Sequence, residues 1–263
     1  MYAINYTKAS DVSDAVTKLA TADDGKLLAG GQTLLPTLKQ RLASPDQLID
    51  LAECGLSSIS TSSDAIKIGA MTCHADVAKH KDVAAANPGL ASLAGGIGDR
   101  QVRNCGTIGG SVANNDPAAC YPSALLALGA TVHTNTRDIA ADEFFTGMFE
   151  TALDDDEVIT VIILPNPQKS AYIKFPNPAS RYAMVGVFVA KFADGVRVAV
   201  TGAGEDGVFH ATNIEAALSA NFDAASLDSL VMSEDGLMED IHASPAYRAH
   251  LIVEMARRAV AAC

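Results

Sequence analysis

Two glycine pairs with neighbouring hydroxyl side chains are the residues of this sequence best suited to binding a ligand. The pair at residues 30–31 is followed by Thr33, and the pair at residues 109–110 lies between Thr107 and Ser111. Glycine lets backbone N–H groups approach an anion because no Cβ intervenes, and a helix N-terminus adds partial positive charge at the same place. One such loop alone is more typical of a tight turn. Two in one chain favour a ligand with a pyrophosphate that is held from both sides.

A third glycine-rich segment, residues 202–207 (GAGEDG), has the spacing of a dinucleotide-binding turn without its context. That motif requires a helix to begin at its end, with free N–H groups facing the phosphates. Here Glu205 and Asp206 would place two carboxylates at the pyrophosphate, and the residues from Val208 onward are typical of a strand. We therefore predict a hairpin turn and no nucleotide site at this segment.

The sequence offers no candidate catalytic residue and no candidate metal site. It lacks a Walker sequence, a G-x-S-x-G nucleophile motif and an H-E-x-x-H zinc motif. His74 follows Cys73, but neighbours on a helix point in different directions, so we interpret both as ordinary helix residues. The acidic run at residues 154–157 is interpreted as a solvated turn. A chain that binds a large cofactor without substrate chemistry of its own is consistent with electron transfer.

The elements that would position these loops follow from hydrophobic spacing. The first loop is predicted between a strand at residues 26–29 and a helix that has Pro36 in its first turn, and the second lies within the glycine-rich segment 95–110. Further strands are predicted at residues 47–51, 66–69, 130–134, 158–164, 182–192, 195–201 and 208–211, and helices at 12–19, 122–128, 214–220 and from Pro245 onward. Pro165 and Pro167 end the strand at 158–164, so we expect a domain boundary near residues 165–172.

Composition and charge exclude several classes of function. The chain has 263 residues, with 19 basic and 31 acidic side chains, and its net charge of −12 disfavours binding to nucleic acid or to an anionic membrane surface. No apolar run of transmembrane length is present, and we expect no signal peptide. The five cysteines, at positions 54, 73, 105, 120 and 263, are odd in number and include no Cys-x-x-Cys. A reducing, cytoplasmic location is expected, and this chain alone offers no iron–sulfur or structural zinc site.

Several segments resemble one known family. Residues 29–36 (AGGQTLLP), 97–114 (IGDRQVRNCGTIGGSVAN), 116–119 (DPAA) and 141–147 (ADEFFTG) are similar to the FAD-binding medium subunit of molybdenum hydroxylases, the family of the carbon monoxide dehydrogenase medium chain and the xanthine dehydrogenase flavin domain. The likeness extends over nearly the whole chain. Its specificity lies in the presence of both glycine loops in this order.

The resemblance implies an α+β fold. A two-lobed FAD-binding domain of the PCMH/VAO-like type would occupy residues 1–168, and a small C-terminal α+β domain with a short antiparallel sheet would occupy residues 169–263. It also implies an oxidoreductase subunit with noncovalent FAD. Electrons would arrive from [2Fe-2S] clusters on a small subunit, which are reduced by a molybdopterin site on a large subunit, and would leave to an external acceptor.

By position, the resemblance assigns a set of cofactor-binding residues to this chain. They are Leu28, Ala29, Gly30, Gly31, Gln32, Thr33, Leu34, Ile97, Thr107, Ile108, Gly109, Gly110, Ser111, Asn114, Asp116, Leu164 and Lys174. Lys174 would lie near the isoalloxazine and offset negative charge that develops on reduction, although a surface lysine at a strand end is an equally good interpretation. Tyr182 would lie over the ring. The family commonly has an acidic residue at the position of Cys120, so one polar contact to the cofactor is in doubt.

Two other functions remain open from the sequence. The chain could be a self-contained flavin oxidoreductase with its own substrate site in the C-terminal domain, or a non-redox nucleotide-binding or assembly protein. Nothing in the sequence names the substrate of a complex, its electron acceptor or its stoichiometry.

Overall fold

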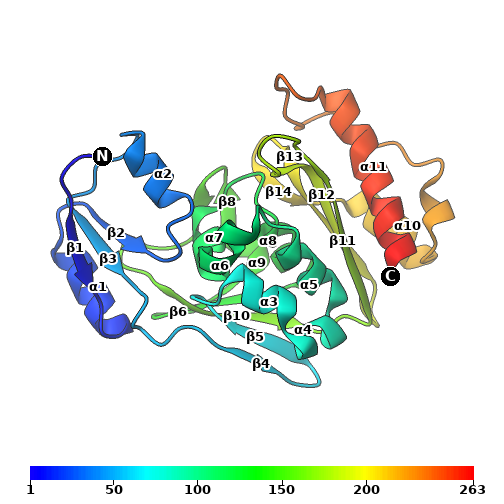
Figure 1. Ribbon diagram of the computed structural model, residues 1–263. Coiled ribbons are helices and arrows are strands. Elements are labelled where there is room, and N and C mark those ends of the chain that lie inside the picture. Colours follow the sequence, from blue (N-terminus) through cyan, green and yellow to red (C-terminus); the bar gives the residue numbers. More distant parts are fainter.

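The first lobe of the chain is a small parallel sheet with two helices. The computed structural model describes residues 1–263, and Figure 1 shows this lobe at one end of the molecule. Its strands are β1 (Asn5–Lys8), β2 (Gly25–Leu28) and β3 (Gln47–Asp50), in the order β1-β3-β2, and its helices are α1 (Val12–Thr21) and α2 (Leu34–Lys39). The side chain of Asp11 caps α1 by accepting from Asp14 N.

The second lobe is a five-stranded antiparallel sheet covered by short helices. The strands, in the order β4-β5-β10-β6-β7, are β4 (Ile59–Thr61), β5 (Ala65–Gly69), β10 (Ile159–Pro165), β6 (Thr131–Thr134) and β7 (Asp138–Ala140). The helices are α3 (His74–Lys79), α4 (Lys81–Ala86), α5 (Pro88–Gly95), α6 (Arg100–Cys105), α7 (Ile108–Asn114), α8 (Tyr121–Leu128) and α9 (Ala141–Phe144), and a hairpin of β8 (Phe145–Gly147) and β9 (Glu150–Thr151) follows α9. The β-branched run of β10 takes the central place, with Ile162 fully buried.

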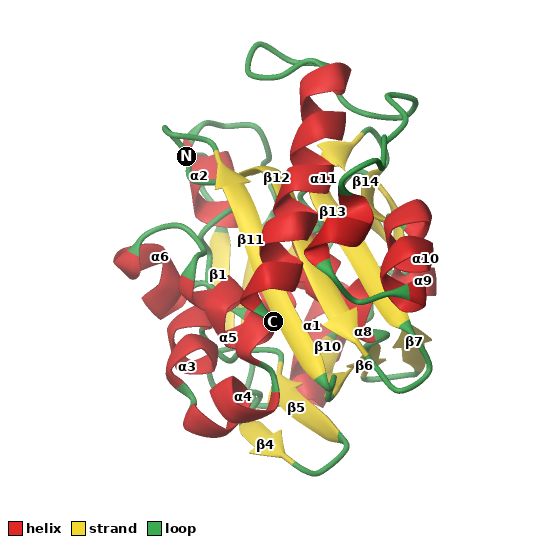
Figure 2. Cartoon of the chain, turned by 90° about the vertical axis from the view of Figure 1, so that its right-hand side faces the viewer, coloured by secondary structure: helices red, strands yellow, loops and turns green.

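The C-terminal part is a four-stranded antiparallel sheet whose own helices pack on one face, while helices of the second lobe cover the other. Its strands are β11 (Lys169–Pro176), β12 (Ala183–Lys191), β13 (Val196–Gly204) and β14 (Gly207–His210), and its helices are α10 (Thr212–Ala220), the 3-10 turn η1 (Ala224–Leu227) and α11 (Pro245–Ala262). The side chains of alternate residues of β12 pack into two different hydrophobic cores, because successive side chains of a strand point to opposite faces of the sheet. Val187 packs toward α11, whereas Phe188 joins the core of the second lobe. Figure 2 shows α11 lying across the sheet.

The mixed α+β architecture confirms the predicted fold class, and the hairpin interpretation of residues 202–207 is also correct. Gly204 pairs with Gly207, and Glu205 and Asp206 form the turn between β13 and β14. The chain passes from β10 to β11 between Pro165 and Lys169, yet one hydrophobic core continues across that passage. The division into domains at 168/169 stays a prediction.

Candidate functional site

A cavity of about 680 Å³ lies where the three parts of the chain meet. Residues of the first lobe, of the helix-covered second lobe and of the strand end at Lys174 line it together. Its volume lies within the range of pockets that bind small organic ligands. Most of the predicted cofactor-binding residues line it: Ala29, Gly30, Gly31, Gln32, Thr33, Leu34, Ile97, Thr107, Gly109, Gly110, Ser111, Asn114, Asp116 and Lys174.

Three predicted residues do not line the cavity. Leu28 is the last residue of β2 and is half-buried just before the first loop. Ile108 and Leu164 are fully buried in the core of the second lobe. The start of β10 approaches the cavity instead, through Ile159. The individual contacts to a cofactor stay predictions.

The first glycine loop presents a run of unpaired backbone donors. None of the N–H groups of residues 30–34 has an acceptor within the protein, whereas the carbonyl oxygens of Gly31 and Thr33 already accept from the turns of α2. Gly30, Gly31 and Leu34 are half-buried and Gln32 and Thr33 are exposed, so these donors at the start of α2 are free to bond an acceptor in the cavity. The left-handed conformation of Gly31, with φ of +67°, turns the chain sharply from β2 into α2. This loop therefore fits an anion such as a pyrophosphate.

The second glycine loop differs, because the N–H groups of residues 108–111 are bonded within the protein. Ile108 N and Gly109 N donate to backbone oxygens of residues 72 and 70, at 3.1 and 2.9 Å. The next two donors both bond Thr107: Gly110 N to the side-chain oxygen at 3.1 Å and Ser111 N to the carbonyl oxygen at 3.0 Å. The expectation that both loops offer backbone donors is thus wrong for the second loop. It contributes shape and side-chain hydroxyls, because its helix is capped and docked on the end of β5.

The two loops lie directly against each other. A Cβ placed on Gly110 would lie 3.4 Å from the Cβ of Ala29, which precedes the first glycine pair. A Cβ on Gly30 would collide with the carbonyl oxygen of Cys105 and would lie 2.7 Å from the Cα of Gly106. Only glycine at position 30 allows this backbone-to-backbone contact, which brings both segments to one side of the cavity.

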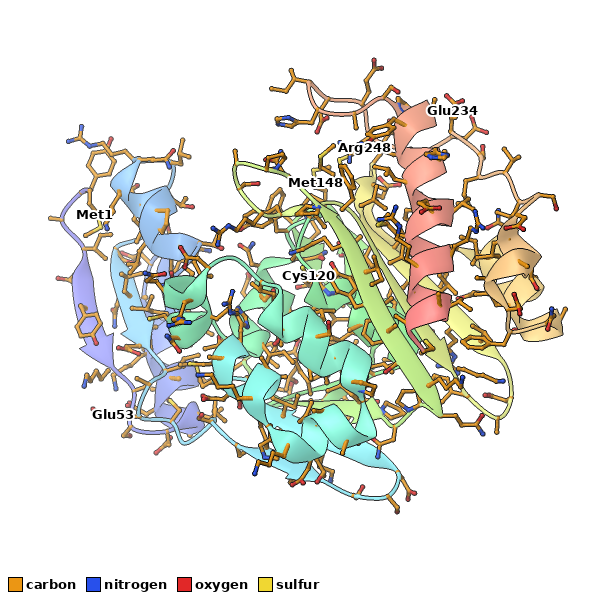
Figure 3. All side chains as sticks on the ribbon, turned by 45° about the vertical axis from the view of Figure 1, so that its right-hand side comes forward. Met1, Glu53, Cys120, Met148, Glu234 and Arg248 are labelled. Atoms are coloured by element: carbon orange, nitrogen blue, oxygen red, sulfur yellow. The ribbon has the colours of Figure 1, made fainter.

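The side chain of Lys174 connects three segments of the chain at one end of the cavity. Its Nζ donates to Gly96 O at 2.8 Å and to Arg181 O at 3.0 Å, and it lies 3.6 Å from the Cys120 sulfur. Figure 3 shows Cys120 near the centre of the molecule, between the helices of the second lobe and the C-terminal sheet. Tyr182 also lines the cavity, and burial raises the pKa of its hydroxyl. Three separate segments therefore fix one ammonium group at this wall.

Burial and hydrogen bonds shift the pKa of three other titratable groups of the lining. Burial lowers the pKa of His74 to about 4, so the imidazole is neutral at physiological pH. Burial raises the pKa of Asp116. Glu157 has a fully buried side chain, and its hydrogen bond from Arg137 chiefly lowers its pKa to about 2. Lys174 and Arg181 line the cavity without an acidic ion-pair partner, and their positive charges favour an anionic ligand.

Sequence reasoning missed several lining residues. His74 was interpreted only as a helix residue, and Phe149 and Arg181 were not identified. Phe149 and Arg181 have positive φ angles of 59° and 64°, and no pattern in the sequence predicts this backbone conformation. The spacing of Leu51 indicated only a strand, although this residue also reaches the cavity.

The chain contains no cluster of three or more His, Cys, Asp or Glu side chains that could hold a metal ion. No helix combines the length and the apolar character that crossing a membrane would take.

Comparison with known proteins decides the family. Residues 2–167 match the model of the FAD binding domain in molybdopterin dehydrogenase. The chain belongs to this family. The nicotine 6-hydroxylase medium subunit of Paenarthrobacter nicotinovorans is 34% identical over 98% of this chain and 96% of its own length. The carbon monoxide dehydrogenase medium chain of Afipia carboxidovorans is 34% identical over 70% of this chain and 67% of its own.

Solved structures show the same likeness over nearly the full length. A Cu,Mo-CO dehydrogenase chain superposes with a TM-score of 0.89 at 29% identity, covering 98% of this chain and 96% of that one. Carbon monoxide dehydrogenase from Hydrogenophaga pseudoflava gives a TM-score of 0.88 at 32% identity, covering 99% and 97%. This member of the molybdopterin dehydrogenase family is accordingly an FAD-binding medium chain of a multi-subunit oxidoreductase complex.

Proposed function

We propose that this chain binds FAD between its two glycine loops and carries electrons through the complex. Electrons would come from [2Fe-2S] clusters on a small subunit, which receive them from a molybdopterin site on a large subunit, and would leave to an external acceptor. Membership of the family supports this assignment.

The observation that carries the proposal is the run of unpaired N–H groups at residues 30–34. These donors would hold the pyrophosphate of FAD. The second loop would close the same side through the hydroxyls of Thr107 and Ser111. Lys26 and Leu51 belong to the first-lobe part of the lining, where the adenosine half would fit, and Lys174 belongs to the part contributed by the C-terminal sheet, where the isoalloxazine would fit.

When bound, FAD supplies a ring that accepts electrons and releases them again. The protein's contribution is to fix and tune that ring. The ammonium of Lys174 is held by two carbonyl oxygens and would offset negative charge on a reduced ring without reorganising. Apolar side chains such as Ile97 would exclude water from the same space. No cysteine or histidine is assigned a covalent link, so the cofactor would be held by noncovalent contacts alone.

The decisive experiment is to purify the complex and to follow its flavin. We expect a yellow protein that releases FAD on denaturation, with flavin reduced by the substrate of the complex only while the partner subunits are present. Protein that takes up no FAD on reconstitution would contradict the proposal. Turnover by the isolated chain would instead identify a self-contained flavin oxidoreductase, and binding of ADP-containing ligands without flavin preference would identify a non-redox nucleotide-binding protein.

A further inference from the structure

Two free cysteines lie next to each other behind the first glycine loop. Cys73 directly precedes α3, and Cys105 is the last residue of α6. The sulfur of Cys73 lies 3.4 Å from Asn104 O and 4.0 Å from Cys105 O. A backbone bond from His74 N to Gly106 O, 3.0 Å long, fixes the two segments side by side. The two thiols therefore belong to one local structure, although 32 positions separate them in the sequence.

The two thiols differ in access. Cys105 is exposed, whereas Cys73 is half-buried. Burial raises the pKa of the Cys73 thiol, which makes it the less reactive of the two toward an oxidant. An exposed thiol beside a sheltered one matches the arrangement in which the first is oxidised and the second then condenses with it.

The segment that carries Cys105 also touches the proposed FAD loop. The Cys105 carbonyl oxygen occupies the space that a Cβ on Gly30 would fill, and the Cα of Gly106 lies nearly as close. The contact is directly between backbone atoms, without an intervening side chain. A displacement of residues 104–106 is therefore transmitted directly to the backbone of residue 30, which begins the run of unpaired donors.

We propose that Cys73 and Cys105 are a modification site for hydroperoxides: they join in a disulfide on oxidation, and this bond weakens FAD binding at the first loop. The Cys105 thiol cleaves the peroxide O–O bond and becomes a sulfenic acid, with release of water from hydrogen peroxide or of the alcohol from an organic hydroperoxide. The Cys73 thiol then attacks that sulfur, the S–S bond forms and one water leaves. Two electrons pass in total from the two thiols to the hydroperoxide, and a dithiol reductant reverses the change.

The geometry gives the reason for the effect on FAD. A disulfide requires Cα atoms about 4.4–6.8 Å apart and a fixed torsion about the S–S bond. The present contact is from the Cys73 sulfur to a carbonyl oxygen, so bonding needs rotation of the exposed Cys105 side chain, and the fixed geometry of the disulfide would then constrain the end of α6. Since α6 contains no buried residue, its end moves more easily than the core around α3. The constraint falls on the segment that supports Gly30. This consequence rests on the proposed binding of FAD at residues 30–34.

The test uses the full chain in its purified complex, treated with hydrogen peroxide or with dithiothreitol. Non-reducing peptide mass spectrometry is expected to find a peptide linking residues 73 and 105 only after peroxide. Flavin fluorescence of the filtrate should show an apparent Kd for FAD at least tenfold higher in the oxidised protein, and dithiothreitol should restore it. Cys73→Ser and Cys105→Ser should each bind FAD as tightly as the dithiothreitol-treated unmodified protein, and peroxide should no longer raise their Kd for FAD. Cys263→Ser, at the end of α11, serves as the matched control and should respond like the unmodified chain.

The two readouts separate the possible failures. If both cysteine peptides appear unlinked after peroxide, or linked only between two copies of the chain, the modification site is refuted whatever happens to FAD. If the linked peptide forms and FAD affinity stays the same, the coupling to the first loop is refuted. Failure of the reduced protein to bind FAD at all would refute the proposed function, while the linked peptide would still be detectable.

Discussion

Replacing Gly31 with alanine tests the role of the first loop, and the same replacement at Gly55, which has a similar backbone conformation, is the control. Gly31 has φ of +67°, and Gly55, in a loop away from the cavity, has φ of +70°. Alanine in the left-handed region costs roughly 1–2 kcal/mol. A Cβ on Gly31 would lie 2.9 Å from the end of the Leu35 side chain, which can turn aside, and a Cβ on Gly55 would meet nothing within 4 Å. Both variants should thus lose about 1–2 kcal/mol of unfolding free energy.

Only the Gly31→Ala variant should also lose FAD affinity. Relief of the strain rotates the peptide groups of the loop, and one N–H bond to a charged phosphate contributes about 1.5–3 kcal/mol. At 1.4 kcal/mol for each factor of ten, this predicts a Kd for FAD raised by about 10- to 150-fold. Urea unfolding and FAD titration by flavin fluorescence measure the two quantities. Equal FAD affinity in Gly31→Ala and Gly55→Ala would refute the assignment of these N–H groups to the pyrophosphate.

Three further predictions follow from charged groups. The Lys174→Gln variant should still bind FAD, but the two-electron reduction potential of the bound flavin should fall by on the order of tens of mV, where 30 mV corresponds to about 1.4 kcal/mol. A redox titration measures this potential, and the control variant Lys169→Gln, at the start of the same strand, should leave it unchanged. The pKa of His210 is raised above 6.5, chiefly by its hydrogen bond with Glu215. Protonated His210 therefore stabilises the fold fully below pH 6.5, and this stabilisation is lost as the pH rises through the raised pKa. Thermal melts of His210→Asn should lose this pH dependence. The carboxylate of Glu157, with its pKa lowered from 4.5 to about 2, stabilises the fold above pH 4.5 and loses this effect as pH falls toward 2; Glu157→Gln should cost about 1.5–3 kcal/mol in urea unfolding at neutral pH, and an unchanged midpoint would contradict it.

The glycine loops show how far local reasoning reached. The sequence predicted a strand before the first glycine pair and a helix after it, and β2 and α2 have those places. It predicted equal roles for the two loops, since both have adjacent glycines and hydroxyls. The structure distinguishes them through distant partners, because the oxygens of residues 70 and 72 accept the first donors of α7. No local pattern at 107–111 contains that information.

The contacts of Lys174 show the same limit. Its place near a strand end followed from the sequence, but three segments meet at its ammonium: the end of α5, the start of α8 and the loop before β12. Leu164 shows the reverse case, because its predicted place at the end of a buried strand is correct while the cavity lies at the other end of β10.

By itself, the sequence determined many of the α+β elements and the hairpin at residues 202–207, because hydrophobic period and glycine spacing act over a few positions of the chain. Its motifs carried the resemblance to the family, but no strand was predicted for residues 169–176, which form β11. The tertiary structure alone decided which N–H groups stay unpaired, which lobes enclose the cavity and that Cys73 lies beside Cys105. These features depend on hydrogen bonds and close backbone contacts between segments far apart in the chain, and such contacts exist only once the lobes have packed together.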